Sequence, residues 1–334
     1  MRTRSHGCAI VCVLCVCSYL HAAQVFRSDV DGVTIQVSVT QRNRPVAGLT
    51  TSDFQLLDNG VLQTLSTFEA QPIPLDLTLL LDLSTSVDGA QLQRLKTAVR
   101  ETAALLHSDD RIRLVVMSQV LREVVSLRPA SAAIRLDDLS AGGATSLYDG
   151  LAAALMRRSE NGRRQLIVAL TDGRDSSSIL AESDVKDIAR LSDAVIDLVV
   201  AIGGSAADNG THRLAQRNSL DSLLGSNVVS DRSSRPSSAS EDERIVAGLR
   251  SLAAATGGDV MTLGPDESLS RSFAAVLNAF RAGYVLQYMP HDVAPGGWHE
   301  VTVSVKKGGH YDVRARRGYR GRSTISEPVP KETR

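Results

Sequence analysis

The chain has no cysteine after Cys17, few aromatic residues and no excess of either charge. Its four cysteines all lie close to the start, at Cys8, Cys12, Cys15 and Cys17. The rest of the chain therefore forms no disulfide and offers no thiolate for catalysis or metal binding. With 4% aromatic residues and a formal net charge of zero, nothing in the composition indicates a nucleic-acid-binding surface.

Residues 1–23 have the pattern of a secretory signal peptide. Arg2 and Arg4 give a positive start, the apolar stretch Ala9–Leu20 is short for a membrane span, and two alanines before residue 24 suit cleavage. We therefore predict a secreted or periplasmic protein with no membrane span in the mature chain. A short membrane anchor is the alternative interpretation of the same segment.

Short strands are expected at both ends of the mature chain. Residues 24–71 contain the alternating strand Val33–Val39 and two further strands, Phe54–Leu57 and Leu62–Phe68, joined by a turn that contains an Asn-Gly pair. Residues 283–321 are again strand-like, and residues 322–334 form a tail. Because neither segment has enough strands to bury a face alone, we predict that the two pair into one flanking β domain.

Strands and helices alternate between residues 72 and 282. The predicted strands are Leu75–Leu81, Ile112–Met117, Val120–Leu127 (an antiparallel edge strand), Leu166–Leu170, Val195–Ile202 and Val260–Leu263. The predicted helices are Gln91–Leu106, Ser131–Leu139, Leu147–Arg157, Glu182–Leu191, Glu243–Ala255 and Leu269–Phe280. This alternation predicts an α/β fold with a doubly wound (Rossmann-like), mostly parallel sheet. A polar insertion at about residues 204–242 is expected to be disordered.

Oxygen-bearing side chains follow the predicted strands. Asp82, Ser84 and Ser86 come directly after the first strand, Thr145 lies in a glycine-rich loop, and Asp172 follows the strand Leu166–Leu170. Ligands of open parallel sheets bind outside the carboxyl ends of the strands, where such loops converge. Carboxylates and hydroxyls suit Mg²⁺ or Mn²⁺ better than Zn²⁺. Together these residues predict one hard-oxygen metal site.

Each of these residues also has an ordinary structural role open to it. Ser84 and Ser86 could cap the following helix, Thr145 could cap the helix that starts at Leu147, and Asp172 with Gly173 could form a turn. Two nearby carboxylates, Asp88 and Asp149, are interpreted as caps or solvated charges rather than as ligands.

The five residues, in this order and spacing, resemble the metal-ion-dependent adhesion site of von Willebrand factor type A domains. The segments DF-QLLDNG, TSLYDGL and WHEVTVSV around them resemble the bacterial VWFA-related family, over nearly all of the mature chain. Val87 departs from this pattern, because a methionine is common there. The resemblance implies the type A fold and a metal site at Asp82, Ser84, Ser86, Thr145 and Asp172. It also implies that the metal coordinates an Asp or Glu carboxylate of a protein partner.

The function implied is divalent-cation-dependent protein binding of the adhesion type, without enzymatic activity. A structural subunit of an envelope assembly, with a non-functional metal site, is one alternative, and a metal-assisted hydrolase is another. The sequence has no Gly-x-Ser-x-Gly motif, and His299-Glu300 is not followed by a second zinc-ligand histidine. Five histidines are expected to be solvated rather than catalytic: His107, His212, His291, His299 and His310. Trp298 is expected to serve packing.

Overall fold

The computed structural model describes residues 32–42, 44–66, 73–84, 87, 89–160, 162–201, 238–264 and 267–321. The predicted signal peptide, the tail, Ser86 and most of the polar insertion lie outside the described residues. Within the described ranges, no helix combines the length and the apolar character needed to cross a membrane.

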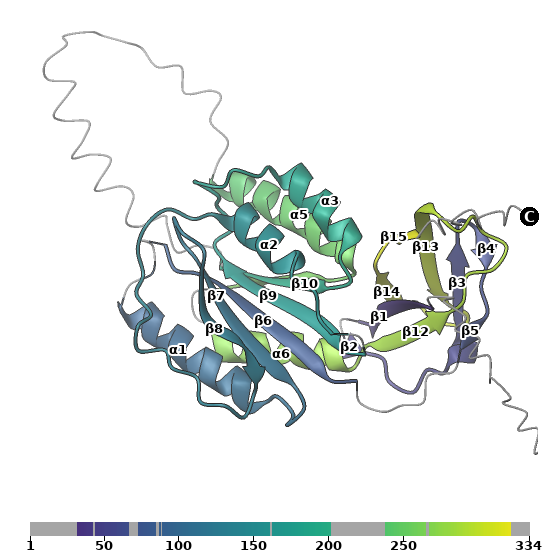
Figure 1. Cartoon of the computed structure of the whole chain (residues 1–334), viewed down its shortest axis with the longest axis horizontal. Coiled ribbons are helices and arrows are strands. Elements are labelled where there is room, and N and C mark those ends of the chain that lie inside the picture. Colours follow the sequence, from purple (N-terminus) through teal and green to yellow (C-terminus); the bar gives the residue numbers. More distant parts are fainter. Residues whose placement is uncertain are drawn as a thin grey trace, which may run out of the picture. The chain divides into compact units, whose positions relative to one another are not determined.

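A six-stranded sheet forms the centre of the α/β domain (Figure 1). Its strand order is β11-β10-β9-β6-β7-β8, and every neighbouring pair is parallel except β7 and β8. The strands are β6 (Leu75–Asp82), β7 (Arg111–Met117), β8 (Arg122–Pro129), β9 (Arg164–Thr171), β10 (Val195–Ala201) and β11 (Val260–Leu263). The predicted doubly wound sheet and its antiparallel edge strand are confirmed.

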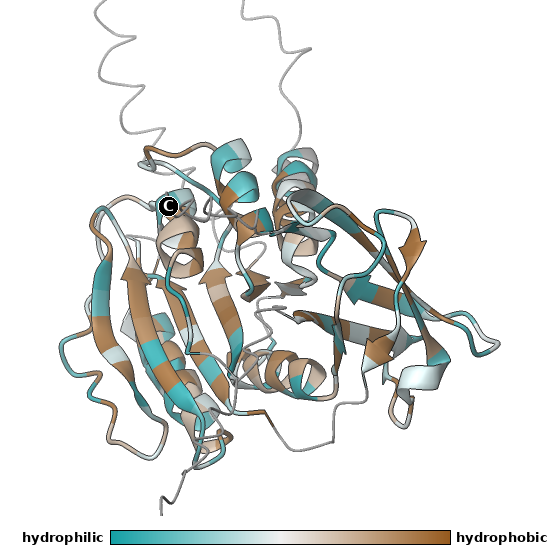
Figure 2. Cartoon of the chain, turned by 45° about the vertical axis from the view of Figure 1, so that its right-hand side comes forward, coloured by the Kyte–Doolittle hydropathy of each residue, from teal (hydrophilic) through white to brown (hydrophobic). Residues whose placement is uncertain are grey.

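Helices cover both faces of this sheet. They are α1 (Gly89–Ala104), α2 (Leu147–Leu155), α3 (Glu182–Leu191), α5 (Ser238–Thr256) and α6 (Leu269–Arg281). Leu79 and Leu81 of β6 pack with α1 and α6, whereas Leu80 packs with α2, α3 and α5. Every residue of β6 is buried, because helices cover both faces of the sheet and shield the side chains that point to either face. In Figure 2 the strands of this sheet are accordingly coloured mostly as hydrophobic.

Two predicted helices differ from the observed structure. The segment Ser131–Leu139 is irregular rather than helical, although Leu136 and Leu139 are buried in the core. Leu136 and Leu139 flank a single turn, in which the backbone N–H of Leu139 donates to the carbonyl of Leu136 at 3.3 Å. Both leucines reach the core from this turn, so their burial does not require a helix. Helix α5 begins at Ser238, five residues before the predicted start and within the segment predicted to be disordered. Glu241 and Asp242 in its first turns are favoured there by the helix dipole, and both pair with Arg174.

The β segments at the two ends of the chain pair with each other. Strand β1 lies between β12 and β14 in one sheet, and β3 pairs with β13 in another. The first sheet contains β1 (Val33–Gln41), β2 (Arg44–Pro45), β5 (Leu65–Ser66), β12 (Tyr284–Tyr288) and β14 (Asp312–Ala315). The second contains β3 (Phe54–Asp58), β4 (Val61–Leu62), β13 (Gly297–Val305) and β15 (Gly318–Gly321). This confirms the predicted flanking domain built from N- and C-terminal strands.

The strand predicted over Leu62–Phe68 is divided between the two sheets. Strand β4 pairs with β3, whereas β5 pairs with β12. The chain changes sheets at Gln63, whose buried side-chain amide donates to the carbonyl of His291 and accepts a hydrogen bond from its backbone N–H. These two bonds hold the crossing point against the C-terminal segment, which the sequence pattern of the hairpin alone does not reveal.

A buried polar cluster joins the two β sheets. Asp58 of β3 is fully buried and accepts hydrogen bonds from the hydroxyls of Tyr288 at 2.8 Å and Tyr319 at 2.7 Å. The ring Nδ1 of His299 lies 2.8 Å from the other Asp58 carboxylate oxygen. The prediction of a solvated His299 is wrong, since only 1% of this residue is exposed. Side chains of β13 point alternately inward and outward, and His299 points inward, toward the carboxylate of Asp58, which is distant in the sequence.

The β domain also contacts the α/β domain through arginines. Arg164, at the start of β9, donates to the side-chain oxygen of Gln36 in β1 at 2.8 Å and to the backbone carbonyl of Phe280 at 2.6 Å. Its guanidinium also lies 4.0 Å from the centre of the Phe280 ring. Arg316, which follows β14, pairs with Asp193 beyond α3. These contacts tie β1 and β14 to the amino-terminal ends of β9 and β10, opposite the end of the sheet where the oxygen-bearing loops meet.

Candidate functional site

The order of the central strands reverses at β6. The chain passes from β6 to β7 on one side of it and later to β9 on its other side. The carboxyl end of β6 is therefore the topological switch point, where open α/β sheets bind ligands. Asp82 is the last residue of β6, and only 6% of it is exposed. The sheet thus places a buried carboxylate at its preferred ligand-binding position.

Three groups donate hydrogen bonds to the Asp82 carboxylate. The hydroxyl of Thr145 lies 3.2 and 3.4 Å from its two oxygens, and the hydroxyl of Thr171 lies 3.1 Å from one of them. The backbone N–H of Ser84 donates to it at 3.1 Å. Thr171 ends β9, the strand next to β6, so its position follows from the parallel register. Hydroxyl and carboxylate oxygens from three separate segments therefore converge at one point.

The charge of Asp82 is poorly compensated. Burial raises the pKa of its carboxyl, and the nearby negative charge of Asp172 raises it further. The hydrogen bonds from Ser84, Thr171 and Thr145 act in the opposite direction. Among the described residues, no Lys, Arg or His forms an ion pair with Asp82. A buried carboxylate without a cationic partner is costly, and a bound cation would remove that cost.

Asp172 is held by a tight turn at the end of β9. One of its carboxylate oxygens accepts a hydrogen bond from the backbone N–H of Arg174 at 2.9 Å, and Gly173 between them has a φ of +82°. The Arg174 guanidinium pairs instead with Glu241 at 3.2 Å and Asp242 at 3.0 Å, in the first turns of α5. The predicted turn at Asp172-Gly173 is thus present. Asp172 also lies close enough for its charge to raise the pKa of Asp82.

The loop that carries Thr145 is fastened to the loop after Asp172. The backbone N–H of Thr145 donates to the hydroxyl of Ser176 at 2.9 Å, and that of Leu147 donates to Asp175 at 2.8 Å. Asp149 accepts hydrogen bonds from the backbone N–H groups of Ile179 and Leu180. Asp149 is therefore a half-buried loop anchor rather than the cap or solvated charge that the sequence predicted.

Several of these roles were not predicted from the sequence. Thr145 does not cap α2, because its hydroxyl is directed to Asp82 and Asp175 supplies the bond to the first helical N–H. Thr171 and the run Asp175–Ser178 were not identified as part of the site. The signal was present, since three serines after an aspartate in a loop offer many local acceptors for backbone N–H groups.

The predicted site residues stand as follows in the structure. Asp82 and Thr145 are in hydrogen-bond contact, and Asp172 is near enough for its charge to affect Asp82. Ser84 is buried beside them, 7% exposed, with its backbone bonded to Asp82. Ser86 lies outside the described residues.

The donor set suits a hard divalent ion rather than zinc. It consists of carboxylates and hydroxyls, with no imidazole or thiolate. In the described part of the chain, no three His, Cys, Asp or Glu side chains gather as metal ligands do. A site here would therefore hold its ion with two carboxylates, hydroxyls and water, which is the incomplete protein ligation that Mg²⁺ accepts.

The family model of the von Willebrand factor type A domain matches residues 76–234. The chain contains a von Willebrand factor type A domain. Domains of this family are generally protein-interaction modules rather than enzymes. The observed fold extends the matched range to the end of α6, so that β11 and α6 complete the domain.

Matching solved structures differ widely in how much of each chain is shared. Proximal thread matrix protein 1 from the mussel byssus is 14% identical, with a TM-score of 0.34 over 39% of this chain and 38% of its own. An aerotolerance-related membrane protein from Bacteroides fragilis is 14% identical, with a TM-score of 0.39 over 62% and 98%. A von Willebrand factor type A protein from Catenulispora acidiphila is 13% identical, with a TM-score of 0.45 over 86% and 73%. No curated protein matches the chain.

Proposed function

We propose that the type A domain binds a protein partner through a divalent cation, Mg²⁺ or Mn²⁺, held at the carboxyl end of β6. The ligands would be Asp82, Thr145 and Asp172, with Ser84 and Ser86 completing the first loop. The protein-interaction role agrees with the family to which residues 76–234 belong. In this proposal the protein is not an enzyme.

The observation that carries this proposal is the environment of Asp82. Its carboxylate is buried, its pKa is raised by burial and by Asp172, and the hydroxyls of Thr145 and Thr171 are directed at it. An arrangement that concentrates negative charge without a cationic side chain is stabilised by a metal ion. When bound, the ion would supply a coordination position for an Asp or Glu carboxylate of the partner.

The role of this chain's own residues is to hold the site rigid and partly dry. The bonds from Ser176 and Asp175 to the Thr145 loop fix the position of its hydroxyl. The Arg174 pairs with Glu241 and Asp242 keep the guanidinium away from Asp172. A preorganised site loses less entropy on binding, so these loop contacts favour affinity for the partner carboxylate.

Addition of MgCl₂ is expected to raise the melting temperature of the protein. At an ion concentration 100-fold above Kd, ligand binding stabilises the folded state by about 2.7 kcal/mol, or about 5–10 °C for a domain of this size. Asp82→Asn should abolish the shift, because it removes the central charge and keeps the shape and an acceptor oxygen. Differential scanning fluorimetry with and without EDTA measures both effects.

The matched control is Asp187→Asn, which removes an exposed carboxylate from α3. This variant should keep the full Mg²⁺ shift. Equal Mg²⁺ affinity of the wild type and the Asp82→Asn variant in calorimetry would refute the site. Metal binding without any metal-dependent protein binding would instead favour the structural-subunit alternative, and turnover of a phosphoester would favour the hydrolase.

We further propose that the protein works outside the cytoplasm, because residues 1–23 have the composition of a signal peptide. Mass spectrometry of the exported chain should then find an N-terminus at or near Gln24. An intact chain that begins with Met1 and stays with the cytoplasmic fraction would contradict the proposal.

A further inference from the structure

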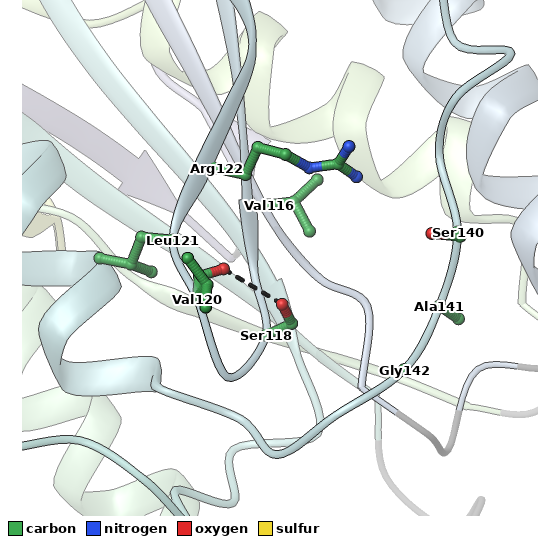
Figure 3. A pocket seen from close by; sticks show the side chains of 8 residues that line it. All are labelled: Val116, Ser118, Val120, Leu121, Arg122, Ser140, Ala141 and Gly142. Atoms are coloured by element: carbon green, nitrogen blue, oxygen red, sulfur yellow. Dashed lines mark hydrogen bonds between the residues drawn. The ribbon is translucent and has the colours of Figure 1, made fainter.

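A hollow lies beside the candidate metal site, between the β7–β8 hairpin and the segment Ser140–Gly142 (Figure 3). Its volume is about 310 Å³. It is lined by Val116, Ser118, Val120, Leu121, Arg122, Ser140, Ala141 and Gly142. We call it the hairpin groove. The hydroxyl of Ser118 donates to the carbonyl of Val120 at 3.1 Å, which stiffens the hairpin turn that forms one wall.

The walls of the hairpin groove are bonded to the segments of the metal site. The backbone N–H of Gly142 donates to the carbonyl of Leu83 at 2.7 Å, and Leu83 directly follows Asp82. The N–H of Leu83 in turn donates to the carbonyl of Met117 at 3.0 Å. Thr145 lies three residues beyond Gly142 in the same loop. A ligand held at Asp82 and Thr145 therefore has the hairpin groove as its immediate neighbour.

The hairpin groove has one charged lining residue, and that residue is basic. Arg122 is exposed, lies opposite Val116 in the β7–β8 ladder, and extends its guanidinium toward the Ser140–Gly142 segment (Figure 3). Within the described residues it forms no ion pair. The next residue, Glu123, differs in this respect, because it pairs with Arg157 at 2.6 Å and lies 3.8 Å from Arg113.

Apolar surface accompanies this positive charge. Val116 and Arg122 point into the same space in Figure 3, and Val120 at the hairpin turn is 70% exposed. Val116 is itself only 2% exposed, so the accessible apolar surface is mainly that of Val120. A long acidic side chain could place its methylene groups against Val120 while its carboxylate meets the guanidinium, with which carboxylates form paired hydrogen bonds. The groove thus complements glutamate better than a small neutral side chain.

We propose that the hairpin groove binds a second acidic side chain of the partner, on the same extended segment as the acid at the metal. This inference rests on the proposed function and specifies the partner further. The partner segment carries two carboxylates a few residues apart, the first directed to the site at Asp82 and the second to Arg122. An extended chain advances about 3.4 Å per residue. We therefore expect the two acids of the partner to lie two to four positions apart in its sequence.

The test uses trifluoroacetyl-labelled peptides with the sequence Gly-Asp-(Gly)n-Glu-Gly-amide and with one, two or three central glycines. Their binding to the full chain in MgCl₂ is measured by fluorine NMR, beside the same peptides with glutamine in place of glutamate. At the best spacing, the diacid peptide should bind the wild type about twofold to fivefold more tightly than its glutamine counterpart, as expected for an exposed ion pair.

Arg122→Gln should abolish that difference and leave the affinity for the glutamine peptide unchanged. Arg128→Gln is the matched control, because Arg128 lies on the same strand opposite Ile112, at the other end of β8. It should preserve the difference and so exclude an effect of net charge alone.

The possible failures of the two proposals are distinct. Equal affinities of both peptides for the wild type, with binding that still requires Mg²⁺, would overturn the groove and leave the proposed function intact. Binding that depends on Arg122 but not on Mg²⁺ would support an acid-binding groove and contradict the metal-dependent function. Absence of binding by every peptide, with and without Mg²⁺, would overturn both.

Discussion

Replacing Asp58 with alanine is expected to destabilise the β domain by about 1–3 kcal/mol for each buried donor that it leaves without an acceptor. The variant leaves the hydroxyls of Tyr288 and Tyr319 and the ring nitrogen of His299 without their common acceptor in a dry interior. Burial raises the pKa of both tyrosines, so their hydroxyls remain protonated donors. The loss should exceed that of a surface substitution several-fold.

The single tryptophan makes this prediction specific to the β domain. Trp298 precedes His299 on β13 and lies over Gly318, where an added Cβ would come within 2.4 Å of its ring. Urea unfolding followed by tryptophan fluorescence should shift strongly in Asp58→Ala, and less in Asp58→Asn, which keeps one acceptor oxygen. Far-UV circular dichroism reports mainly the helices of the type A domain and should shift less. An unchanged fluorescence midpoint in Asp58→Ala would contradict a structural role for the cluster.

Asp197→Asn is expected to stabilise the protein at pH 8 by about 3 kcal/mol, the equivalent of a shift of two pKa units. Burial raises the pKa of Asp197, on β10, to about 6, although the backbone N–H of Asp259 donates to its carboxylate at 2.7 Å. The charge of Arg314 lowers this pKa and that of Asp259 raises it, and these two residues pair with each other. Asparagine keeps the acceptor oxygen and removes the buried charge.

The pH dependence of this effect has a defined sign. The pKa of Asp197 is higher in the folded protein than the ordinary aspartate value of 3.8. Near pH 3 the carboxyl is protonated in both states, so wild type and variant should be equally stable. As the pH rises from about 4 to 6, the unfolded state releases the proton first, and the wild type loses stability relative to the variant. Chemical denaturation at pH 3.5, 5 and 8 should show a growing difference, and a constant difference would contradict the burial argument.

The sequence predicted the central sheet because its signals are local. Buried strands such as Leu75–Leu81, with five leucines among its seven residues, are rich in apolar side chains, and the helices between them have clear apolar periodicity. The segment Ser131–Leu139 was wrongly predicted as helical because its apolar spacing fits a helix as well as a folded loop. Only the position of the core decides between them, and that position is a tertiary property.

The candidate site could be predicted in part for the same reason. Asp82, Thr145 and Asp172 follow strands or enter a helix, so the topology of a parallel sheet brings them to one edge. The partners of these residues are harder to foresee. Ser176 bonds Thr145 from 31 positions away, and Asp58 meets His299 across 241 positions. Such pairings depend on loop conformation and on sheet pairing, neither of which leaves a periodic signature in the sequence.

The pairing of the two chain ends also sets an order of events during synthesis. The strands and helices of the type A domain lie between residues 75 and 281, so this domain can form once that region has left the ribosome. Strand β1 is made early, yet its partners β12 and β14 emerge only after residue 283. Until then its apolar side chains, Ile35, Val37 and Val39, have no core to enter. A nascent chain of this protein therefore carries β1 without its two main partner strands for most of its synthesis, a state open to aggregation and to chaperone capture.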